Sequence, residues 1–238
     1  MTPQTGSRRR LLPVSILLVL ALAFAGLGIW QVKRLAWKEA LIADVDRALH
    51  AAPIAPTAIP AGDIAPLAYH RVTLSGRFLP AATVLVTATS NLGNGYWVMV
   101  PLAAPGGAAP VWINRGFVPL GTRLDTARAA VPAGPVAIVG LVRPNEPHGT
   151  FLRANRPEAE RWYARDLPVM AARRGVASET RYFLDAQSET PRPTAAPVPV
   201  TGLTVIAFPN NHLSYALTWF ALCALSLGAA IMVWRKAR

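Results

Sequence analysis

The sequence has a single cysteine, few acidic residues and two long stretches without any charged residue. The cysteine, Cys223, lies inside one of these stretches, so the rest of the chain has neither disulfide bonds nor a thiolate metal site. Lysine and arginine number 24 against 12 acidic residues, a formal net charge of +12. Because no basic patch with a recognisable module accompanies this excess, we expect no nucleic-acid partner. An anionic membrane lipid surface is the expected partner of the basic tails.

Enzymatic signatures are also missing. The sequence has no nucleophile elbow, no two-histidine zinc helix and no phosphate-binding loop. The acidic residues show no spacing that singles out a carboxylate pair, and the four histidines are scattered. Copper handling would need soft ligands that the middle of the chain lacks. We therefore predict that the protein is not an enzyme and has no catalytic residues.

The two uncharged stretches are Leu11–Val32 and Leu213–Trp234, each of 22 residues. As helices they would be roughly 33 Å long, enough to cross a bilayer. Basic residues flank them in the tails, residues 1–10 and 235–238. Because short basic tails decide orientation, we place both tails in the cytoplasm. Residues 33–212 then form a periplasmic domain of a multi-pass protein in the cell inner membrane.

A cleaved signal peptide is the alternative interpretation of the first stretch. Arg8-Arg9-Arg10 would be its basic region and Ala23-Phe24-Ala25 a small-residue cleavage site. The apolar run continues through Gly26–Trp30 into a helical pattern, which favours a retained membrane anchor. Both interpretations export the domain.

Helical spacing of apolar residues continues beyond the first stretch to about His50. Four prolines and little charge then predict an extended connector at Ala51–Ala68. Alternation of apolar and polar residues in Tyr69–Phe78 predicts a half-buried strand. Further strands are expected at Thr83–Thr87, Tyr96–Leu102, Val111–Val118, Val136–Val142, Arg181–Asp185 and Leu203–Phe208.

A short helix is expected late in the domain, at Leu167–Arg174, with Asp166 as its N-cap and Gly175 at its end. A second proline-rich connector is expected at Ala186–Thr201. Strands that follow one another through short loops predict antiparallel pairing. The expected fold is a membrane α+β protein, in which two transmembrane helices flank a mainly antiparallel β domain with a few helices.

His212 lies immediately before the second apolar stretch, in Pro209-Asn210-Asn211-His212. In the simpler interpretation, Asn210 or Asn211 caps the helix and His212 marks the membrane interface. In the functional interpretation, His212 is an axial ligand of haem iron, with the flat cofactor at the membrane surface. Tyr215 and Trp219 lie on roughly the same side of that helix, which would suit either a ring edge or ordinary helix packing.

Two more groups of residues have alternative interpretations. Arg115, in an alternating strand, is either a solvent-facing arginine or the partner of a carboxylate, such as a haem propionate or a residue of another protein. Trp30, Gln31, Arg34 and Lys38 form a polar and aromatic cluster at the end of the first stretch. This cluster is either an anchoring belt or a docking surface.

Three segments carry a shared pattern: Gly28-Ile29-Trp30-Gln31 with Arg34, Lys38 and Leu41-Ile42; Asn114-Arg115-Gly116-Phe117-Val118-Pro119; and the eleven positions from Asn210 to Phe220. Together they resemble the Surfeit-locus cytochrome oxidase assembly factors, and the chain resembles a bacterial member of that family. The order and spacing of the segments and the two-span frame extend the resemblance over nearly the whole chain. Phe117 stands where a tryptophan is usual, which puts in doubt any role that needs an indole N–H.

The resemblance implies an assembly factor for haem–copper cytochrome c oxidase that helps its catalytic subunit mature and is linked to insertion of haem a. His212 would then contact the haem, with Arg115 near a propionate, and the catalytic subunit and other assembly factors would be the partners. Two alternatives stay open: a scaffold that binds the subunit without cofactor, and a membrane-anchored enzyme acting on a periplasmic or lipid substrate. The expected partner-binding residues are Trp30, Gln31, Arg34, Lys38, Asn210, Asn211, Tyr215 and Trp219.

Overall fold

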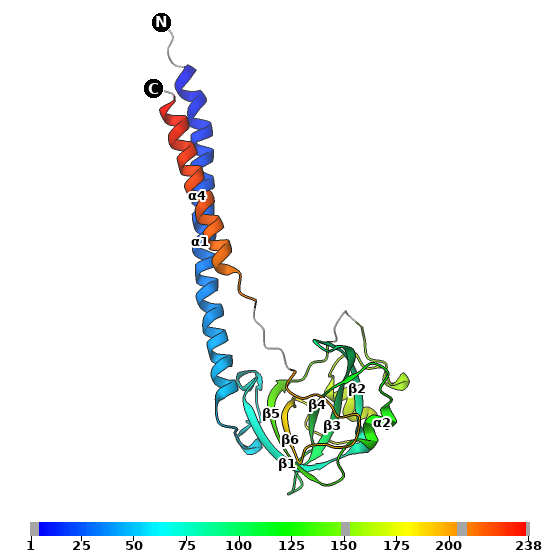
Figure 1. The fold of residues 1–238 in the computed structure, drawn as a ribbon. Coiled ribbons are helices and arrows are strands. Elements are labelled where there is room, and N and C mark those ends of the chain that lie inside the picture. The colour runs from blue at the N-terminus through cyan, green and yellow to red at the C-terminus, as the bar shows by residue number, and fades with distance from the viewer. Residues whose placement is uncertain (1–4, 149–152, 204–208, 237–238) are drawn as a thin grey trace. The chain divides into compact units, whose positions relative to one another are not determined.

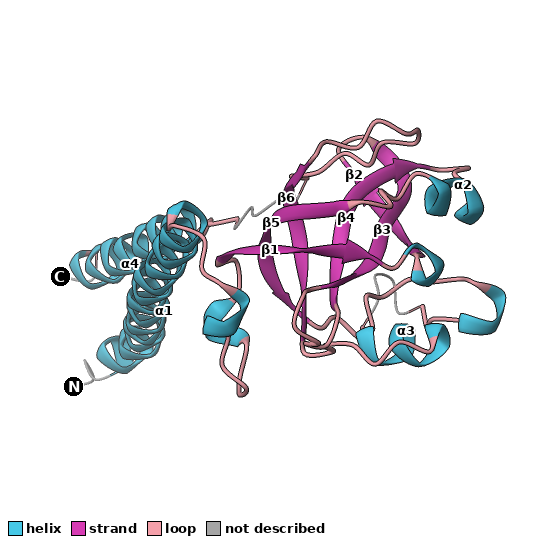
Figure 2. Cartoon of the chain, turned by 90° about the horizontal axis from the view of Figure 1, so that it is seen from below, coloured by secondary structure: helices cyan, strands magenta, loops and turns pink. Residues whose placement is uncertain are grey.

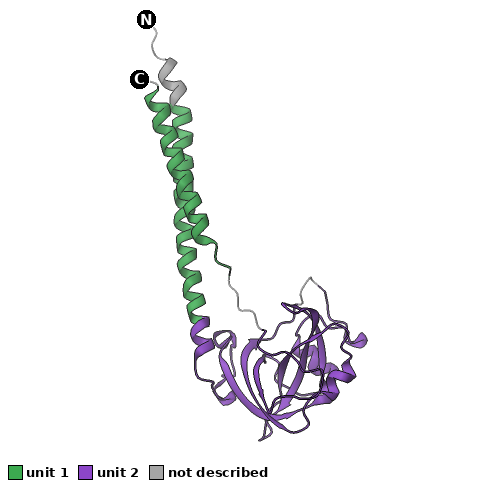
Figure 3. Ribbon diagram, viewed as in Figure 1, with its two compact units in different colours: residues 1–44, 207–238 green, residues 45–206 purple. Residues whose placement is uncertain are grey.

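The structure, a computed structural model, describes residues 5–148, 153–203 and 209–236, with side chains from residue 11 onward. The chain divides into two units, one of residues 1–44 and 207–238 and the other of residues 45–206 (Figure 3). Apart from Leu203, the strand expected at Leu203–Phe208 lies outside the described residues.

The first unit is formed by two long helices, α1 (Thr5–His50) and α4 (His212–Arg235), which lie side by side and run in opposite directions (Figure 1). The rings of Phe24 and Trp219 stack with centroids 5.7 Å apart. Gly28 leaves room for Phe220, because a Cβ atom on Gly28 would lie 2.6 Å from that ring. Small and aromatic residues therefore set the packing of the pair.

Both helices are long and apolar enough to cross a membrane, judged by length and composition. The helical pattern expected up to His50 is confirmed, since α1 continues without a break from its apolar half into its polar half. The last turn of α1 belongs to the second unit, where Ala48 is buried.

The second unit is built on one six-stranded sheet in the order β1-β5-β6-β4-β3-β2 (Figure 2). β1 also pairs with β3 through Arg77 and Phe78, which closes the sheet into a barrel. The pairing of β4 with β6 is parallel and the other strand pairs are antiparallel. The strands are β1 (Arg71–Phe78), β2 (Val84–Ser90), β3 (Gly93–Ala103), β4 (Val111–Pro119), β5 (Pro135–Pro144) and β6 (Tyr182–Thr190).

The barrel interior is filled by aliphatic side chains from alternate strand positions. In β1 the residues Val72, Leu74 and Phe78 are buried while their polar neighbours are exposed, so the predicted half-buried strand is confirmed. It begins at Arg71 rather than Tyr69, because Tyr69 has a φ of 68°, outside the extended region.

A second apolar core lies on the outer face of the barrel. Trp112 and Phe183 point outward from β4 and β6 and pack with Met170 of α3 (Leu167–Arg174). Asp166 accepts a hydrogen bond from the backbone N–H of Val169, and Gly175 ends the helix in the left-handed region, so the predicted caps are confirmed. The other helical segments of the described residues are α2 (Leu124–Ala129) and short 3₁₀ turns at Pro56–Ala58, Ala65–Leu67, Pro80–Ala82 and Pro157–Ala159.

Two expectations about the domain are wrong. The stretch Ala51–Ala68 is not an extended connector, because apolar residues spaced along it, Ile64 among them, pack on the barrel core. β6 does not end at Asp185 but continues to Thr190, in a polar stretch that the sequence pattern assigns to a connector. The sheet is mainly antiparallel, as expected, and its parallel pair arises because β6 is inserted between β5 and β4 and runs parallel to β4.

Candidate functional site

His212 is the first residue of α4, and the two asparagines before it accept hydrogen bonds from backbone N–H groups of the first helical turn. Its backbone N–H donates to Asn210 Oδ1 at 3.4 Å, while Asn211 supplies the backbone oxygen that accepts from Tyr215 N. Asn211 is the N-cap residue, as one of the two interpretations predicts, but it makes no side-chain capping hydrogen bond, and the side chain of Asn210 accepts from the first helical N–H instead. The imidazole of His212 is half-buried.

The imidazole is paired with the other helix of the same unit. His212 Nδ1 lies 2.7 Å from Gln31 Oε1, and Gln31 is only 8% exposed. In the part of the chain that the structure describes, Nε2 of His212 has no hydrogen-bond partner. Gln31 and His212 thus form one partly buried polar contact between apolar helices.

The other predicted residues of the helix pair divide into exposed and packed ones. Trp30 and Tyr215 are 52% and 55% exposed. Arg34 is also exposed, and its guanidinium carbon lies 4.3 Å from the ring centre of Trp37, a cation–π contact on the surface of α1. Trp219 is half-buried against Phe24. Gln31 faces the interior of the pair, so a docking surface on α1 would be formed by its exposed neighbours.

Arg115 is not a solvent-facing arginine, because its side chain is fully buried. Its Nε and Nη2 donate to the two carboxylate oxygens of Glu189 at 3.0 and 2.9 Å. Its guanidinium carbon also lies 5.0 Å from the ring centre of Phe78. The carboxylate that binds Arg115 thus belongs to the same domain, and the expected contact with a haem propionate has no support from this geometry.

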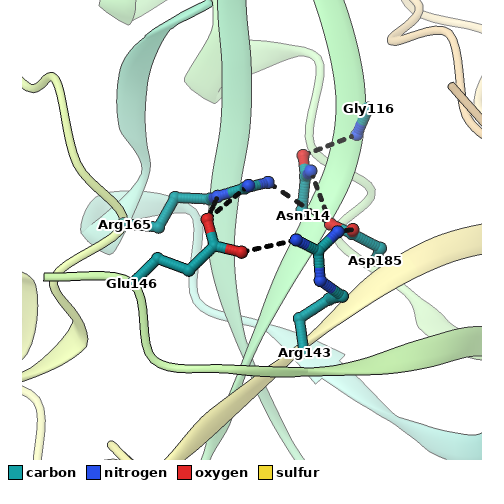
Figure 4. A network of polar contacts seen from close by, with 6 residues as sticks. All are labelled: Asn114, Gly116, Arg143, Glu146, Arg165 and Asp185. Carbon is teal, nitrogen blue, oxygen red and sulfur yellow. Dashed lines mark hydrogen bonds and ion pairs between the residues drawn. The ribbon is translucent and has the colours of Figure 1, made fainter. Parts of the chain in front are cut away.

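A polar network on the outer face of the barrel was not anticipated from the sequence (Figure 4). Asp185 accepts from Asn114 Nδ2 at 2.8 Å and pairs with Arg143 at 3.0 Å. Glu146 links Arg143 to Arg165, whose Nε donates to it at 2.9 Å. Burial alone lowers the pKa of Arg143, but the carboxylates of Asp185 and Glu146 outweigh this and raise it. The guanidinium of Arg143 therefore stays charged, and the network connects three neighbouring strands, β4, β5 and β6.

Asn114, Gly116 and Phe117, which lie beside Arg115 in β4, each have a structural role in the barrel. Asn114 Oδ1 accepts from the backbone N–H of Gly116 at 3.1 Å. Gly116 has a φ of 121°, and a Cβ atom there would lie 2.3 Å from the carbonyl oxygen of Val200. Phe117 pairs with Val200 through two backbone hydrogen bonds. This segment is therefore a junction of the barrel, and its sequence pattern reflects folding.

The described residues contain no group of three or more histidine, cysteine, aspartate or glutamate side chains that could hold a metal ion. Among the described residues, the imidazole of His212 has one ring nitrogen without a hydrogen-bond partner, and a nitrogen of this kind can serve as an axial ligand of haem iron. The residues of the helix pair, rather than the domain network, are the candidate site.

The described residues form two apolar terminal helices and a β-barrel domain. The class of protein is therefore a β-barrel domain with an apolar helix at each end of the chain. The model of the SURF1 family matches residues 18–224. The chain belongs to the SURF1 family, which confirms the resemblance found in its three sequence segments.

The chain is also similar to individual members of this family. It is 32% identical to Surfeit locus protein 1 of Rattus norvegicus over 225 residues, covering 88% of this chain and 71% of the rat protein. It is 34% identical to the SURF1-like protein of Monosiga brevicollis, covering 89% and 83%. Identity to Surfeit locus protein 1 of Homo sapiens is 30%, covering 88% and 73%.

Proposed function

We propose that this protein is a membrane-anchored assembly factor that helps the catalytic subunit of a haem–copper cytochrome c oxidase to mature by presenting haem a to it. The observation that carries the proposal is the imidazole of His212 at the start of an apolar helix, held at one ring nitrogen by Gln31. Membership of the SURF1 family supports the role. The haem is cargo in this role, so the protein is not an enzyme.

We place α1 and α4 across a bacterial inner membrane with the domain in the periplasm. Their length and apolar composition support spanning, and the basic tails support the orientation. A phosphatase that is active only in the periplasm tests the orientation. It should be active on a chain ending at Gly107, in an exposed turn of the domain, and inactive after Arg238. The reverse pattern would contradict the orientation.

The surroundings of His212 suit a flat apolar ligand. Leu213, Tyr215 and Leu217 are exposed on the first turns of α4, where they offer apolar contacts to a porphyrin. Arg34 follows Gln31 by three positions on α1 and so lies on the same side of that helix. Its guanidinium would neutralise a propionate. Arg115 is left out of this proposal, because Glu189 already occupies its guanidinium.

Transient binding of haem fits a role in delivering it to the catalytic subunit. One neutral imidazole can hold the iron from one side and be displaced by a histidine of the catalytic subunit. The full chain, purified in detergent from cells that make haem a, should carry haem with the absorption spectrum of a histidine-ligated iron. His212→Ala should lose the haem or change the spectrum, whereas the exposed His50→Ala should retain both. Absence of haem in the unaltered protein, or an unchanged spectrum in His212→Ala, would refute haem presentation.

A scaffold that binds the catalytic subunit without haem is the second candidate function. It is favoured by the exposed Trp30 and by the Arg34–Trp37 pair, which together offer aromatic and basic side chains on one helix. The scaffold should co-purify with the subunit and carry no haem. Replacing Trp30 and Trp37 by alanine should then abolish co-purification, while His212→Ala should preserve it.

A further inference from the structure

We infer that Gln31 is a positioning residue for His212, which holds the proton on Nδ1 of the imidazole and so leaves Nε2 as the atom that binds iron. The inference rests on the proposed function, because it specifies how the haem contact is prepared. It concerns an atom and a partner residue, neither of which follows from family membership.

The geometry of the pair determines the protonation of the ring. Gln31 Oε1 is a carbonyl oxygen and can only accept a hydrogen bond, and it lies 2.7 Å from His212 Nδ1. With Oε1 as the amide atom that faces the ring, the contact is a hydrogen bond in the tautomer that we infer, the one with hydrogen on Nδ1. In a neutral imidazole the other nitrogen, Nε2, then has a free lone pair, which is the form that a metal requires.

The contact also fixes the direction of the lone pair. With Nδ1 held, the imidazole cannot rotate about the Cβ–Cγ bond without breaking the hydrogen bond. Metal-bound histidines commonly donate their second N–H to a carboxylate or a carbonyl, which orients the ring and strengthens it as a ligand. The amide oxygen of a buried residue supplies this contact here, because Gln31 is only 8% exposed.

The packing of the two helices on the N-terminal side of Gln31 brings its side chain into contact with His212. Gly28 lies one turn before Gln31 on α1, and the ring of Phe220 from α4 occupies the space beside it. Phe24, one turn further back, stacks on Trp219. These contacts set how far the two helices are shifted along each other, because a shift by one turn would separate the ring contacts as well as the hydrogen bond.

The first test uses the full chain in detergent micelles with ¹⁵N-labelled histidine and no haem. The signals of His212 are assigned by their loss in His212→Ala, and ¹⁵N shifts distinguish a protonated from a free ring nitrogen. The unaltered protein should have hydrogen on Nδ1. Gln31→Met keeps the size of the side chain but removes the acceptor, and should give a mixture of both tautomers. Gln31→Glu keeps an acceptor and should retain hydrogen on Nδ1.

Two results of this test would overturn the inference: hydrogen on Nε2 in the unaltered protein, or no change of tautomer in Gln31→Met. A matched control is Gln187→Met, which alters a glutamine of the barrel domain and should leave the His212 signals unchanged. A change of the His212 signals in the control would also count against a specific role of Gln31.

The second test adds hemin to the same proteins and measures its dissociation rate and reduction potential. Loss of an orienting partner weakens metal binding by about 10- to 100-fold. Gln31→Met should therefore release hemin about tenfold faster or more and shift its potential upward. Gln31→Glu should shift the potential downward, because a carboxylate acceptor makes the imidazole a stronger donor. A role limited to helix packing would leave the potential of the Gln31→Glu protein unchanged.

The two proposals fail in different ways. If the unaltered protein binds no hemin, haem presentation is refuted, and the tautomer measured in the first test alone decides the inference about Gln31. If hemin binds through His212 but Gln31→Met changes neither dissociation nor potential, haem presentation stands and the inference about Gln31 is refuted.

Discussion

Arg115 on β4 and Glu189 on β6 join through two parallel hydrogen bonds inside the barrel, at 3.0 and 2.9 Å. Their side chains are 0% and 2% exposed. Glu189 lies opposite Ile138 of β5, a residue of the interior core, so the carboxylate points into the same core. An ion pair thus replaces aliphatic side chains at one position of the barrel interior.

Removing one partner of this pair should destabilise the protein strongly. Glu189→Ala should lower the free energy of unfolding by about 3–5 kcal/mol, because it leaves a buried guanidinium charge without a partner. The double change Arg115→Met with Glu189→Leu should cost much less, since no charge remains buried. Denaturant titration in micelles, followed by tryptophan emission, measures both.

Asp125 provides the control for the ion pair, because it pairs with Arg128 at the surface and its side chain is 78% exposed. Asp125→Ala should change the free energy of unfolding by about 1 kcal/mol or less. A similarly small change in Glu189→Ala would show that the interior pair carries little stability.

Gly76 should not tolerate a side chain, because β1 crosses the end of β3 there. A Cβ atom on Gly76 would lie 2.2 Å from the carbonyl oxygen of Ala103, a backbone atom that cannot move alone. Gly76→Ala should cost about 1–3 kcal/mol of stability by forcing the strands apart. At Gly134 nothing lies within 4 Å of the added atom, so Gly134→Ala should be neutral. Equal stabilities of the two variants would contradict the close approach.

Glu160 should make the domain sensitive to acid. A hydrogen bond from Arg174 lowers the pKa of Glu160 below its usual 4.5, against the opposing effect of burial. A carboxyl with a lowered pKa in the folded state stabilises the protein above pH 4.5, and this contribution is lost as the pH falls through the lowered pKa. Glu160→Gln should therefore flatten the decrease of stability below pH 4.5.

The measurement for Glu160 is the denaturant midpoint of the full chain between pH 3 and 7. Glu158→Gln, two positions away and exposed, is the control and should keep the slope of the unaltered protein. An identical slope in all three proteins would rule out a contribution from Glu160.

Gly28 should be essential for the packing of the helix pair. Gly28→Leu would place a side chain where Phe220 lies and should shift the helices, so that Gln31 no longer reaches His212. Gly26→Leu, with nothing within 4 Å of its Cβ, should leave the pair intact. The ¹⁵N signals of His212 report the result, and unchanged signals in Gly28→Leu would contradict the proposed register.

Elements with local determinants could be predicted from the sequence. The end of α1 at His50 follows from continuous helical spacing, and α3 is bounded by Asp166 and Gly175 as its cap chemistry requires. The alternation in β1 predicts which of its residues are buried. In each case the residues that decide the structure are neighbours along the chain.

The rest of the structure depends on residues far apart in the sequence. Gln31 and His212 are separated by 181 positions, and Arg115 and Glu189 by 74. Strand alternation assigns Arg115 to one face of β4, but it does not reveal that a carboxylate on another strand faces it. The polar end of β6 lacks the apolar pattern of a strand because its glutamate binds that arginine.

Among the residues that the structure describes, β6 is the last strand along the chain, yet it lies between β5 and β4 in the barrel. During synthesis, β1 with β5 and β2 with β3 and β4 can pair first, but β4 and β5 each keep an open edge until Tyr182–Thr190 emerges. His212 follows β6 closely in the chain. The barrel is therefore closed, and the histidine supplied, late in synthesis, so a chain that ends before Tyr182 has neither.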